Sequence, residues 1–231
     1  MNLEYLKENL KDVKDKIEST AKRCNRNPDE IKLIAVSKNF PAEQIDFLNK
    51  SGQIEFGENK VQELSSKAAV LTADRINWHL IGHLQSNKVK EAVETASMIQ
   101  SVDSLKIAAS IQQHSEKLGR STDILIQVNT SGEEQKSGCI PGEAFKLCEN
   151  ICEFPNLNLK GLMTIGKFTE NEIVIRENFR LLRNIFDSVS ISLKKLDFLS
   201  MGMTSDFEIA IEEGSNMLRI GSAIFGSRNY I

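Results

Sequence analysis

The sequence predicts an α/β protein that folds as a single TIM-type (β/α)8 barrel over residues 1–231, with an extra helix at the N-terminus. Short apolar runs alternate with longer polar stretches of helical pattern along the chain, and this alternation is the signature of a parallel sheet. About eight such units fit within the chain, as the barrel requires. No glycine-rich dinucleotide turn follows the first apolar run, so a doubly wound open sheet is the less favoured alternative.

An amphipathic helix comes first, over residues 3–24, and the segment from Asn25 to Pro28 ends it. The apolar runs after it predict strands at residues 31–37, 54–56, 78–81, 98–102, 124–129, 159–164, 198–201 and 218–225. Stretches that open with capping residues or with proline predict helices at residues 41–50, 59–73, 86–95, 104–118, 141–152, 170–192 and 205–213. Each helix is long enough to cross back over the sheet.

The composition indicates one globular domain with a sizeable core, because 40% of the residues are hydrophobic and 26% are charged. A formal net charge of -3 gives no basic field, so neither nucleic acid nor an anionic membrane is expected as a partner. The charged N-terminus does not resemble a signal peptide, and no apolar run has the length of a membrane span. We therefore expect a cytoplasmic location.

No metal site is expected. The four cysteines, at positions 24, 139, 148 and 152, lack the spacing of a zinc site and are read as reduced packing residues. His79 and His83 are four residues apart on and after a predicted strand, and no third ligand is evident. They are interpreted as histidines of the core or of the barrel mouth.

Lys38 closes the first apolar run, where the pattern changes from a strand to a polar turn. The carboxyl ends of barrel strands are where this fold places its reactive groups. A partly desolvated amine there has a lowered pKa and attacks carbonyl carbons, which would make Lys38 a Schiff-base lysine. The alternative is a lysine that only reaches from the strand end to water.

An anion site is indicated at the last two units. The segment from Ser200 to Asp206 puts hydroxyls and a glycine between a strand and a helix, and the segment from Arg219 to Ser222 repeats the arrangement. These are the seventh and eighth loops, the usual phosphate site of the barrel. An ordinary helix cap with a tight turn is the alternative.

Three further residues are candidates for the mouth. Arg219 lies inside an apolar strand and needs an acceptor, for which a heteroaromatic ring nitrogen or an internal carboxylate would serve. Asn59 follows the second strand. The polar loop at residues 129–138 contains Lys136 and has the length of a lid, although it is equally typical of a solvated loop.

Together these segments resemble one family closely, the pyridoxal 5'-phosphate homeostasis proteins. The resemblance runs nearly end to end and rests on residues 35–38, 56–59, 79–88, 128–138, 161–163, 200–206 and 219–226. It implies a barrel like the N-terminal domain of alanine racemase, with pyridoxal 5'-phosphate (PLP) held as an internal aldimine on Lys38. It further implies that Arg219 faces the pyridine nitrogen and that the phosphate is held by Ser200, Gly202, Thr204, Gly221 and Ser222. Asn59 is predicted to bind the cofactor as well.

The family resemblance favours a carrier over a catalyst. Arginine does not readily give up its proton, so it keeps the ring nitrogen unprotonated and weakens the cofactor as an electron sink. Racemases of similar fold use a tyrosine from an extra C-terminal domain, whereas the tyrosines here are Tyr5 and Tyr230, near the two ends. We expect that domain to be absent and the protein to be a monomer.

The predicted function is to bind PLP, to maintain the intracellular pool of vitamin B6 and to deliver PLP to apoenzymes, with no catalytic residues. A small PLP-dependent amino-acid racemase is the alternative. A second alternative is an enzyme that acts on a phosphorylated metabolite through Lys38 without any cofactor. Lys136 is also expected to form a second, weaker aldimine that assists transfer.

Overall fold

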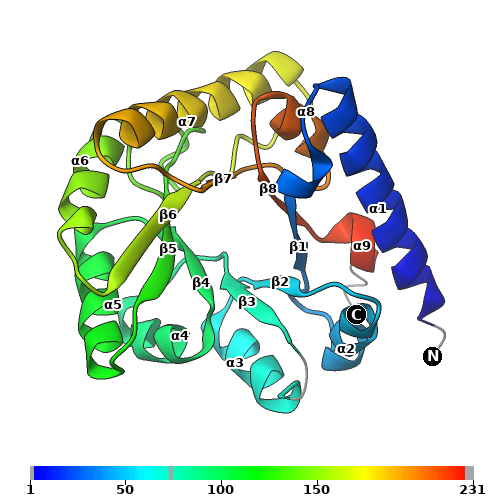
Figure 1. Ribbon diagram of the computed structural model, residues 1–231, viewed down its shortest axis with the longest axis horizontal. Helices are drawn as coiled ribbons and strands as arrows, with labels where there is room; N and C mark the ends of the chain where they lie inside the picture. The colour runs from blue at the N-terminus through cyan, green and yellow to red at the C-terminus, as the bar shows by residue number, and fades with distance from the viewer. Residues whose placement is uncertain (1–2, 73–74, 227–231) are drawn as a thin grey trace.

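The strands close into a barrel in the order in which they occur along the chain (Figure 1). The computed structural model describes residues 3–72 and 75–226. Its parallel strands are β1 (Lys32–Val36), β2 (Glu55–Glu58), β3 (Asn77–Leu80), β4 (Met98–Val102), β5 (Thr122–Gln127), β6 (Leu157–Met163), β7 (Phe198–Ser200) and β8 (Met217–Ile220). The ring closes where β1 pairs with β8, in a register that places Ala35 opposite Ile220.

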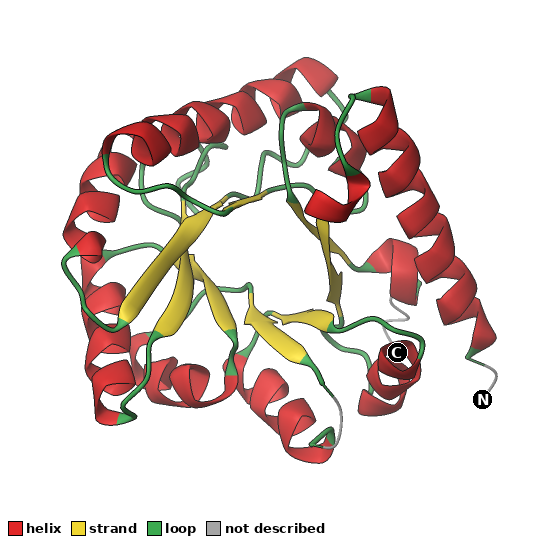
Figure 2. Cartoon of the chain, viewed as in Figure 1, coloured by secondary structure: helices red, strands yellow, loops and turns green. Residues whose placement is uncertain are grey.

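Helices surround the barrel on its outer face (Figure 2). They are α1 (Glu4–Arg23), α2 (Ala42–Lys50), α3 (Val61–Val70), α4 (Val89–Thr95), α5 (Leu105–Lys117), α6 (Pro141–Cys152), α7 (Glu172–Ser192), α8 (Phe207–Glu212) and α9 (Ser222–Phe225), with 3-10 turns η1 (Pro28–Glu30) and η2 (Ser86–Lys88). Side-chain caps mark the N-termini of two of these helices, α5 and α7. The Oγ of Ser104 accepts from the N–H of Ile107 at the start of α5, and Asn171 caps α7 in the same way.

The extra helix α1 packs on α8 and α9, along one side of the barrel (Figure 1). Its buried residues Leu6, Leu10, Val13 and Ile17 recur at helical spacing and form one apolar stripe. Arg26, just after the helix, donates from Nη1 to the carbonyl oxygens of Ile211 and Ser215. The helix predicted before the first strand is therefore a covering element of the last two barrel units.

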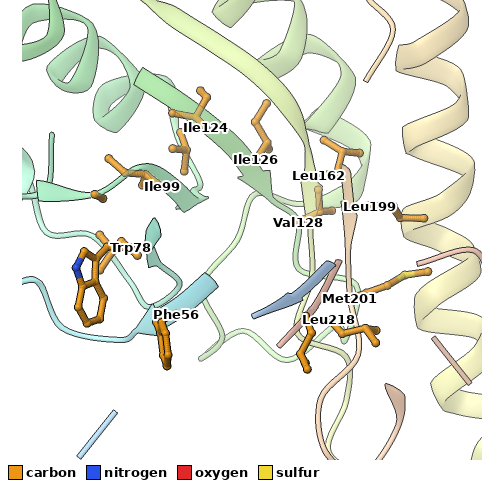
Figure 3. Packing of buried hydrophobic residues seen from close by; sticks show 14 of the residues in the cluster. Phe56, Trp78, Ile99, Ile124, Ile126, Val128, Leu162, Leu199, Met201 and Leu218 are labelled. Atoms are coloured by element: carbon orange, nitrogen blue, oxygen red, sulfur yellow. The ribbon is translucent and has the colours of Figure 1, made fainter. Parts of the chain in front are cut away.

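Two apolar layers follow from the alternation of side chains along each strand. The larger layer lies between strands and helices and contains Phe56, Trp78 and Leu218 (Figure 3). The smaller layer fills the barrel interior with Ile34, Met98, Leu125, Met163 and Met217. Because the interior is filled by side chains, the functional groups are placed at the ends of the strands rather than in a pore.

The predicted barrel is confirmed, and its largest local error concerns the last apolar run. Only Met217–Ile220 is a strand, whereas Ser222–Phe225 forms helix α9. The N–H groups of Ile224 and Phe225 both donate to the carbonyl oxygen of Gly221, which turns the chain directly after the strand. Phe225 then stacks on Phe40 with ring centroids 4.9 Å apart, so these apolar residues pack as a helix.

Other boundaries differ by a few residues. The helix predicted at residues 59–73 spans Val61–Val70, and position 73 lies outside the described residues. The helix predicted at residues 86–95 is divided between η2 and α4, and the helix predicted from residue 205 begins at Phe207. Among the described residues, no helix combines the length and the apolar character needed to cross a membrane.

Candidate functional site

A cavity of about 660 Å³ opens at the carboxyl ends of the strands, and its size suits a small organic ligand. Residues at or after the ends of β1, β2, β3, β5, β6, β7 and β8 all contribute to its wall. The polar residues on the wall are Lys38, Asn59, His83, Gln127, Lys136, Ser137, Thr204, Ser205, Arg219 and Ser222. The described lining contains three cationic side chains and no aspartate or glutamate, so the cavity favours an anionic ligand.

The turn that presents Lys38 is held from both sides by carboxylates. On one side the hydroxyl of Ser37 donates to Glu58 Oε1 at 2.6 Å. On the other the backbone N–H of Asn39 donates to Glu63 Oε1 at 2.5 Å. Asn39 has a φ of +66°, a left-handed conformation that asparagine tolerates better than most residues. The backbone on each side of Lys38 is therefore fixed by side chains of β2 and α3.

A buried lysine joins these two carboxylates. Lys67 Nζ donates to Glu58 Oε1 and to Glu63 Oε1, at 2.7 Å each, and to the carbonyl oxygen of Ser37 at 2.8 Å. Burial raises the pKa of Glu58, while the hydrogen bonds from Lys67 and Ser37 oppose this shift. Glu58, Glu63 and Lys67, here called the Lys67 triad, thus form a charged clamp beneath the Lys38 turn.

Arg219 enters the same cavity from β8, with only 4% of the residue exposed. Its Nη1 donates to Ser200 Oγ at 2.5 Å, and its Nη2 donates to the carbonyl oxygen of Thr164 at 2.7 Å. Burial lowers the pKa of the guanidinium to about 10, against the opposing charge of Asp206. Arg219 therefore stays protonated at neutral pH, and the described residues offer it no ion pair.

The loops after β7 and β8 meet at their hydroxyl groups. Ser222 Oγ donates to Thr204 Oγ1 at 3.2 Å, and the N–H of Ala223 approaches the same oxygen at 3.4 Å. The β7 loop is closed by Asp206, whose Oδ1 accepts from the N–H of Met203 at 2.6 Å. Gly202 has a φ of +98°, and a Cβ there would lie 2.6 Å from Ala210 Cβ. The loop therefore requires glycine at this position.

Comparison with known proteins identifies the family. The family model described as the N-terminal domain of alanine racemase matches residues 1–229. The pyridoxal phosphate homeostasis protein of Vibrio alginolyticus is 40% identical, over 97% of this chain and 98% of its own. That of Haemophilus influenzae is 42% identical, over 100% of this chain and 98% of its own. This chain belongs to the pyridoxal phosphate homeostasis protein family.

Solved structures agree with this assignment. PipY of Synechococcus elongatus, determined with PLP bound, has a TM-score of 0.81 and 33% identity, over 91% of this chain and 100% of its own. An alanine racemase of Clostridium difficile has a TM-score of 0.82 but 15% identity, and shows the fold alone. The curated relatives are named as homeostasis proteins and not as racemases.

Six of the eight residues predicted to hold the cofactor in this family member lie on the cavity wall. They are Lys38, Asn59, Thr204, Arg219, Gly221 and Ser222. Ser200 is fully buried and lies behind Arg219, with its hydroxyl directed to Gln100. Gly202 shapes the β7 loop through its backbone and is not part of the described lining.

Several residues that support the site could not be recognised from the sequence. Gln100 and Lys67 resemble an ordinary strand residue and an ordinary helix lysine, and only the topology shows their contacts. His79 belongs to the core, with 3% of the residue exposed, whereas His83 lines the cavity. No group of three or more metal-ligating side chains occurs within the described part of the chain.

Proposed function

We propose that this protein binds PLP in the cavity, with Lys38 as the covalent attachment point, and that it holds and releases the cofactor to maintain the pool of vitamin B6. One observation carries the proposal. A single cavity brings together an amine, two adjoining hydroxyls and a buried guanidinium, and its described lining has no carboxylate. This donor set fits an aldehyde-bearing, phosphorylated heterocycle.

Different residues of the cavity would contact different parts of PLP. The hydroxyls of Thr204 and Ser222, with the backbone at Gly221, would hold the phosphate, and Arg219 would donate to the ring nitrogen. Lys38 would supply the amine, and Asn59 would line the same wall. When bound, PLP supplies an aldehyde that condenses reversibly with amines, and this reversibility suits storage and release.

Arg219 also favours holding over catalysis. A guanidinium with a pKa of about 10 remains a hydrogen-bond donor at neutral pH, so it does not pass a proton to the ring nitrogen. The unprotonated ring is a weak electron sink. Tyr5 lies on the outer helix α1, and position 230 is outside the described residues. We therefore propose a carrier without a positioned tyrosine acid or base.

The absorption spectrum of the purified protein with added PLP tests the proposal. We expect a visible band that borohydride reduction removes and that is absent from the Lys38→Ala variant. Lys146→Ala is the matched control, because Lys146 is an exposed lysine of α6 that pairs with Glu149. A band of equal strength in Lys38→Ala, or no band in the unaltered protein, would overturn the proposal. If the unaltered protein shows no band, the remaining hypothesis is an enzyme that uses Lys38 as a Schiff-base lysine without a cofactor.

The racemase alternative rests on His83, a titratable side chain that lines the cavity with its Nδ1 3.4 Å from Asp103 Oδ2. It would supply the second acid or base that such chemistry needs. We expect no sustained racemisation of common amino acids by the PLP-loaded protein. Turnover that both Lys38→Ala and His83→Ala abolish would favour the racemase over the carrier.

We propose that Lys136 is a second, weaker attachment point. Its Nζ lies 2.5 Å from Glu133 Oε2 and donates to the carbonyl oxygen of Gly166 at 3.0 Å, while the residue lines the cavity. Mass mapping after borohydride reduction is expected to find most PLP on Lys38 and a minor share on Lys136. Label on Lys38 alone would contradict this role.

We further propose that the protein acts as a monomer in the cytoplasm and passes PLP to apoenzymes. Support comes from the low net charge and from the four cysteines, which are all free thiols. Only Cys139 and Cys148 are buried, so the prediction that all four are packing residues is wrong for Cys152, which is exposed. Sedimentation would measure the mass in solution. Mixing the PLP-loaded protein with a PLP-dependent apoenzyme, in the presence of a scavenger of free PLP, would measure transfer. Activation that the scavenger abolishes would argue against direct transfer.

A further inference from the structure

A line of hydrogen bonds runs from Arg219 through the barrel interior. Arg219 Nη1 donates to Ser200 Oγ at 2.5 Å, and the Ser200 hydroxyl donates to Gln100 Oε1 at 2.8 Å. Gln100 Nε2 lies 3.0 Å from His79 Nδ1, and His79 Nε2 lies 2.7 Å from Glu55 Oε2. These five residues, here called the interior chain, come from β8, β7, β4, β3 and β2.

The chemistry of its first member determines the direction of the interior chain. A guanidinium has only donors, so Ser200 Oγ accepts from it and directs its own hydrogen to the Gln100 carbonyl oxygen. The amide nitrogen of Gln100 therefore faces His79 and donates to Nδ1. An imidazole that accepts at Nδ1 carries its hydrogen on Nε2, so His79 Nε2 donates to Glu55. Every bond points the same way, from a cation to a carboxylate, and such bonds strengthen one another.

The surroundings make this chain costly to interrupt. Gln100 and Ser200 are fully buried, and the interior around them is otherwise occupied by apolar side chains such as Met98 and Met217. A buried polar group that loses its partner weakens the fold or takes another partner. The chain also joins the two ends of the barrel. Arg219 lines the large cavity, and Glu55 lines a second cavity of about 370 Å³ beside the start of β2.

The chain fixes the guanidinium and leaves part of it for a ligand. Arg219 has five N–H donors, and the described residues accept two hydrogen bonds from them, at Ser200 and Thr164. These two bonds set the plane of a rigid, flat group. The remaining donors belong to a residue on the cavity wall. A ring nitrogen in that cavity would therefore meet a donor whose direction Ser200 and Gln100 have already determined.

We propose that Ser200, Gln100 and His79 are positioning residues that orient Arg219 toward the ring nitrogen of the ligand and connect it to Glu55 at the opposite end of the barrel. The inference rests on the proposed function, since the ligand is PLP. It means that residues of the barrel interior determine how tightly the pyridine ring of PLP is held. The covalent attachment of PLP at Lys38 does not depend on this orientation of Arg219.

Gln100→Met tests the proposal, because methionine fills similar space and can neither accept from Ser200 nor donate to His79. The measurements are the rate of PLP release and the 15N resonance of PLP labelled at the ring nitrogen. We expect about tenfold faster release, the effect of one lost charge-assisted hydrogen bond. The resonance is expected to move toward that of a ring nitrogen without a hydrogen bond, which a general loss of stability would not produce.

A matched control has the same substitution outside the barrel interior. Gln112 on α5 also uses both ends of its amide, donating to Asn156 Oδ1 at 3.1 Å and accepting from the N–H of Asn156 at 2.9 Å. Gln112→Met is expected to leave the release rate and the 15N resonance unchanged. Ser200→Ala, a smaller change, is measured beside Gln100→Met and is expected to act in the same direction.

Substitution of His79 tests the order of donors and acceptors. Glutamine also has one acceptor and one donor group, so His79→Gln is expected to behave more like the unaltered protein than His79→Leu does. If Gln100→Met and Ser200→Ala bind PLP with unchanged release and an unchanged resonance, the positioning role is wrong while the proposed function stands. If the unaltered protein does not bind PLP, the proposed function fails first.

Discussion

Two carboxylates of one short strand serve the two sides of the cavity in opposite ways. Glu55 and Glu58 are three residues apart on β2, so they project to opposite faces of the barrel wall. Glu58 faces α3 and joins the Lys67 triad under the Lys38 turn, whereas Glu55 faces the interior and ends the interior chain behind Arg219. One side of the cavity is supported by a compact cluster of charges, and the other by a chain of hydrogen bonds that separates the charged groups of Arg219 and Glu55.

The difference appears in the proton affinities of the two groups. Burial raises the pKa of Glu58, and the hydrogen bonds from Lys67 and Ser37 do not fully offset it. Burial also acts on Glu55, but the hydrogen bond and the electrostatic attraction of His79, together with the charge of Lys32, outweigh it and lower the pKa to about 2. The triad is thus expected to matter most for stability, and the interior chain for ligand orientation.

The largest expected effect comes from removing the lysine of the triad. Lys67→Met leaves Glu58 buried without its cationic partner, so the free energy of unfolding should fall by about 3–5 kcal/mol. Urea denaturation measures it. Lys60→Met, at the exposed position just before α3, should change the value by less than about 0.5 kcal/mol. A loss below about 1 kcal/mol for Lys67→Met would mean that the triad contributes little to stability.

The pH dependence of stability should separate the two carboxylates by sign. The pKa of Glu55 is about 2 in the folded protein, below the 4.5 that is usual for glutamate, so its contribution is present above pH 4.5 and is lost as the pH falls toward 2. Glu58 has a raised pKa, so protonation favours the folded state and its contribution grows as the pH falls through the folded pKa toward 4.5.

The opposite pH dependence of the two contributions can be measured with the variants Glu55→Gln and Glu58→Gln. The difference in unfolding free energy between the unaltered protein and Glu55→Gln should shrink as the pH falls from 4.5 to 2. The unfolding free energy of the unaltered protein minus that of Glu58→Gln should increase as the pH falls toward 4.5. Slopes of the same sign for both variants would contradict the comparison.

A smaller effect is expected from the β7 loop on the Arg219 side. Gly202→Ala adds a Cβ at a φ of +98° and 2.6 Å from Ala210 Cβ, which should cost about 1–3 kcal/mol of stability. Gly142→Ala is the control, because Gly142 has open space around its Cβ position and no positive φ. Thermal unfolding would compare them, and equal midpoints would mean that the loop relaxes without strain.

The barrel could be predicted because alternation along the chain reports which segments are buried. The limits of prediction were also physical. The apolar run from Leu218 to Phe225 is compatible with a strand or with a buried helix. In the structure the strand ends before Gly221 and helix α9 begins after it. Lys38 and Arg219 could be recognised as candidates, since a lysine at a strand end and an arginine inside a strand each need a reason.

The supports of the site could not be predicted in the same way. Lys67 lies four residues after Glu63 on a helix, a spacing that usually marks a solvated surface pair. Its burial depends on Glu58, which belongs to another element. The family resemblance implies that Ser200 holds the phosphate, but strand β7 directs its hydroxyl inward to Gln100. Such contacts depend on which side of the barrel wall each residue faces.

The pairing of β1 with β8 has a consequence for how the protein matures. Lys38 follows the first strand to be synthesised, while Gly221 and Ser222 follow the last, and the two groups are neighbours only across this seam. An unfinished chain has Lys38 but lacks the loops after β7 and β8 and the guanidinium of Arg219. The proposed PLP site is therefore complete only once the barrel has closed, and retention of PLP would report that closure.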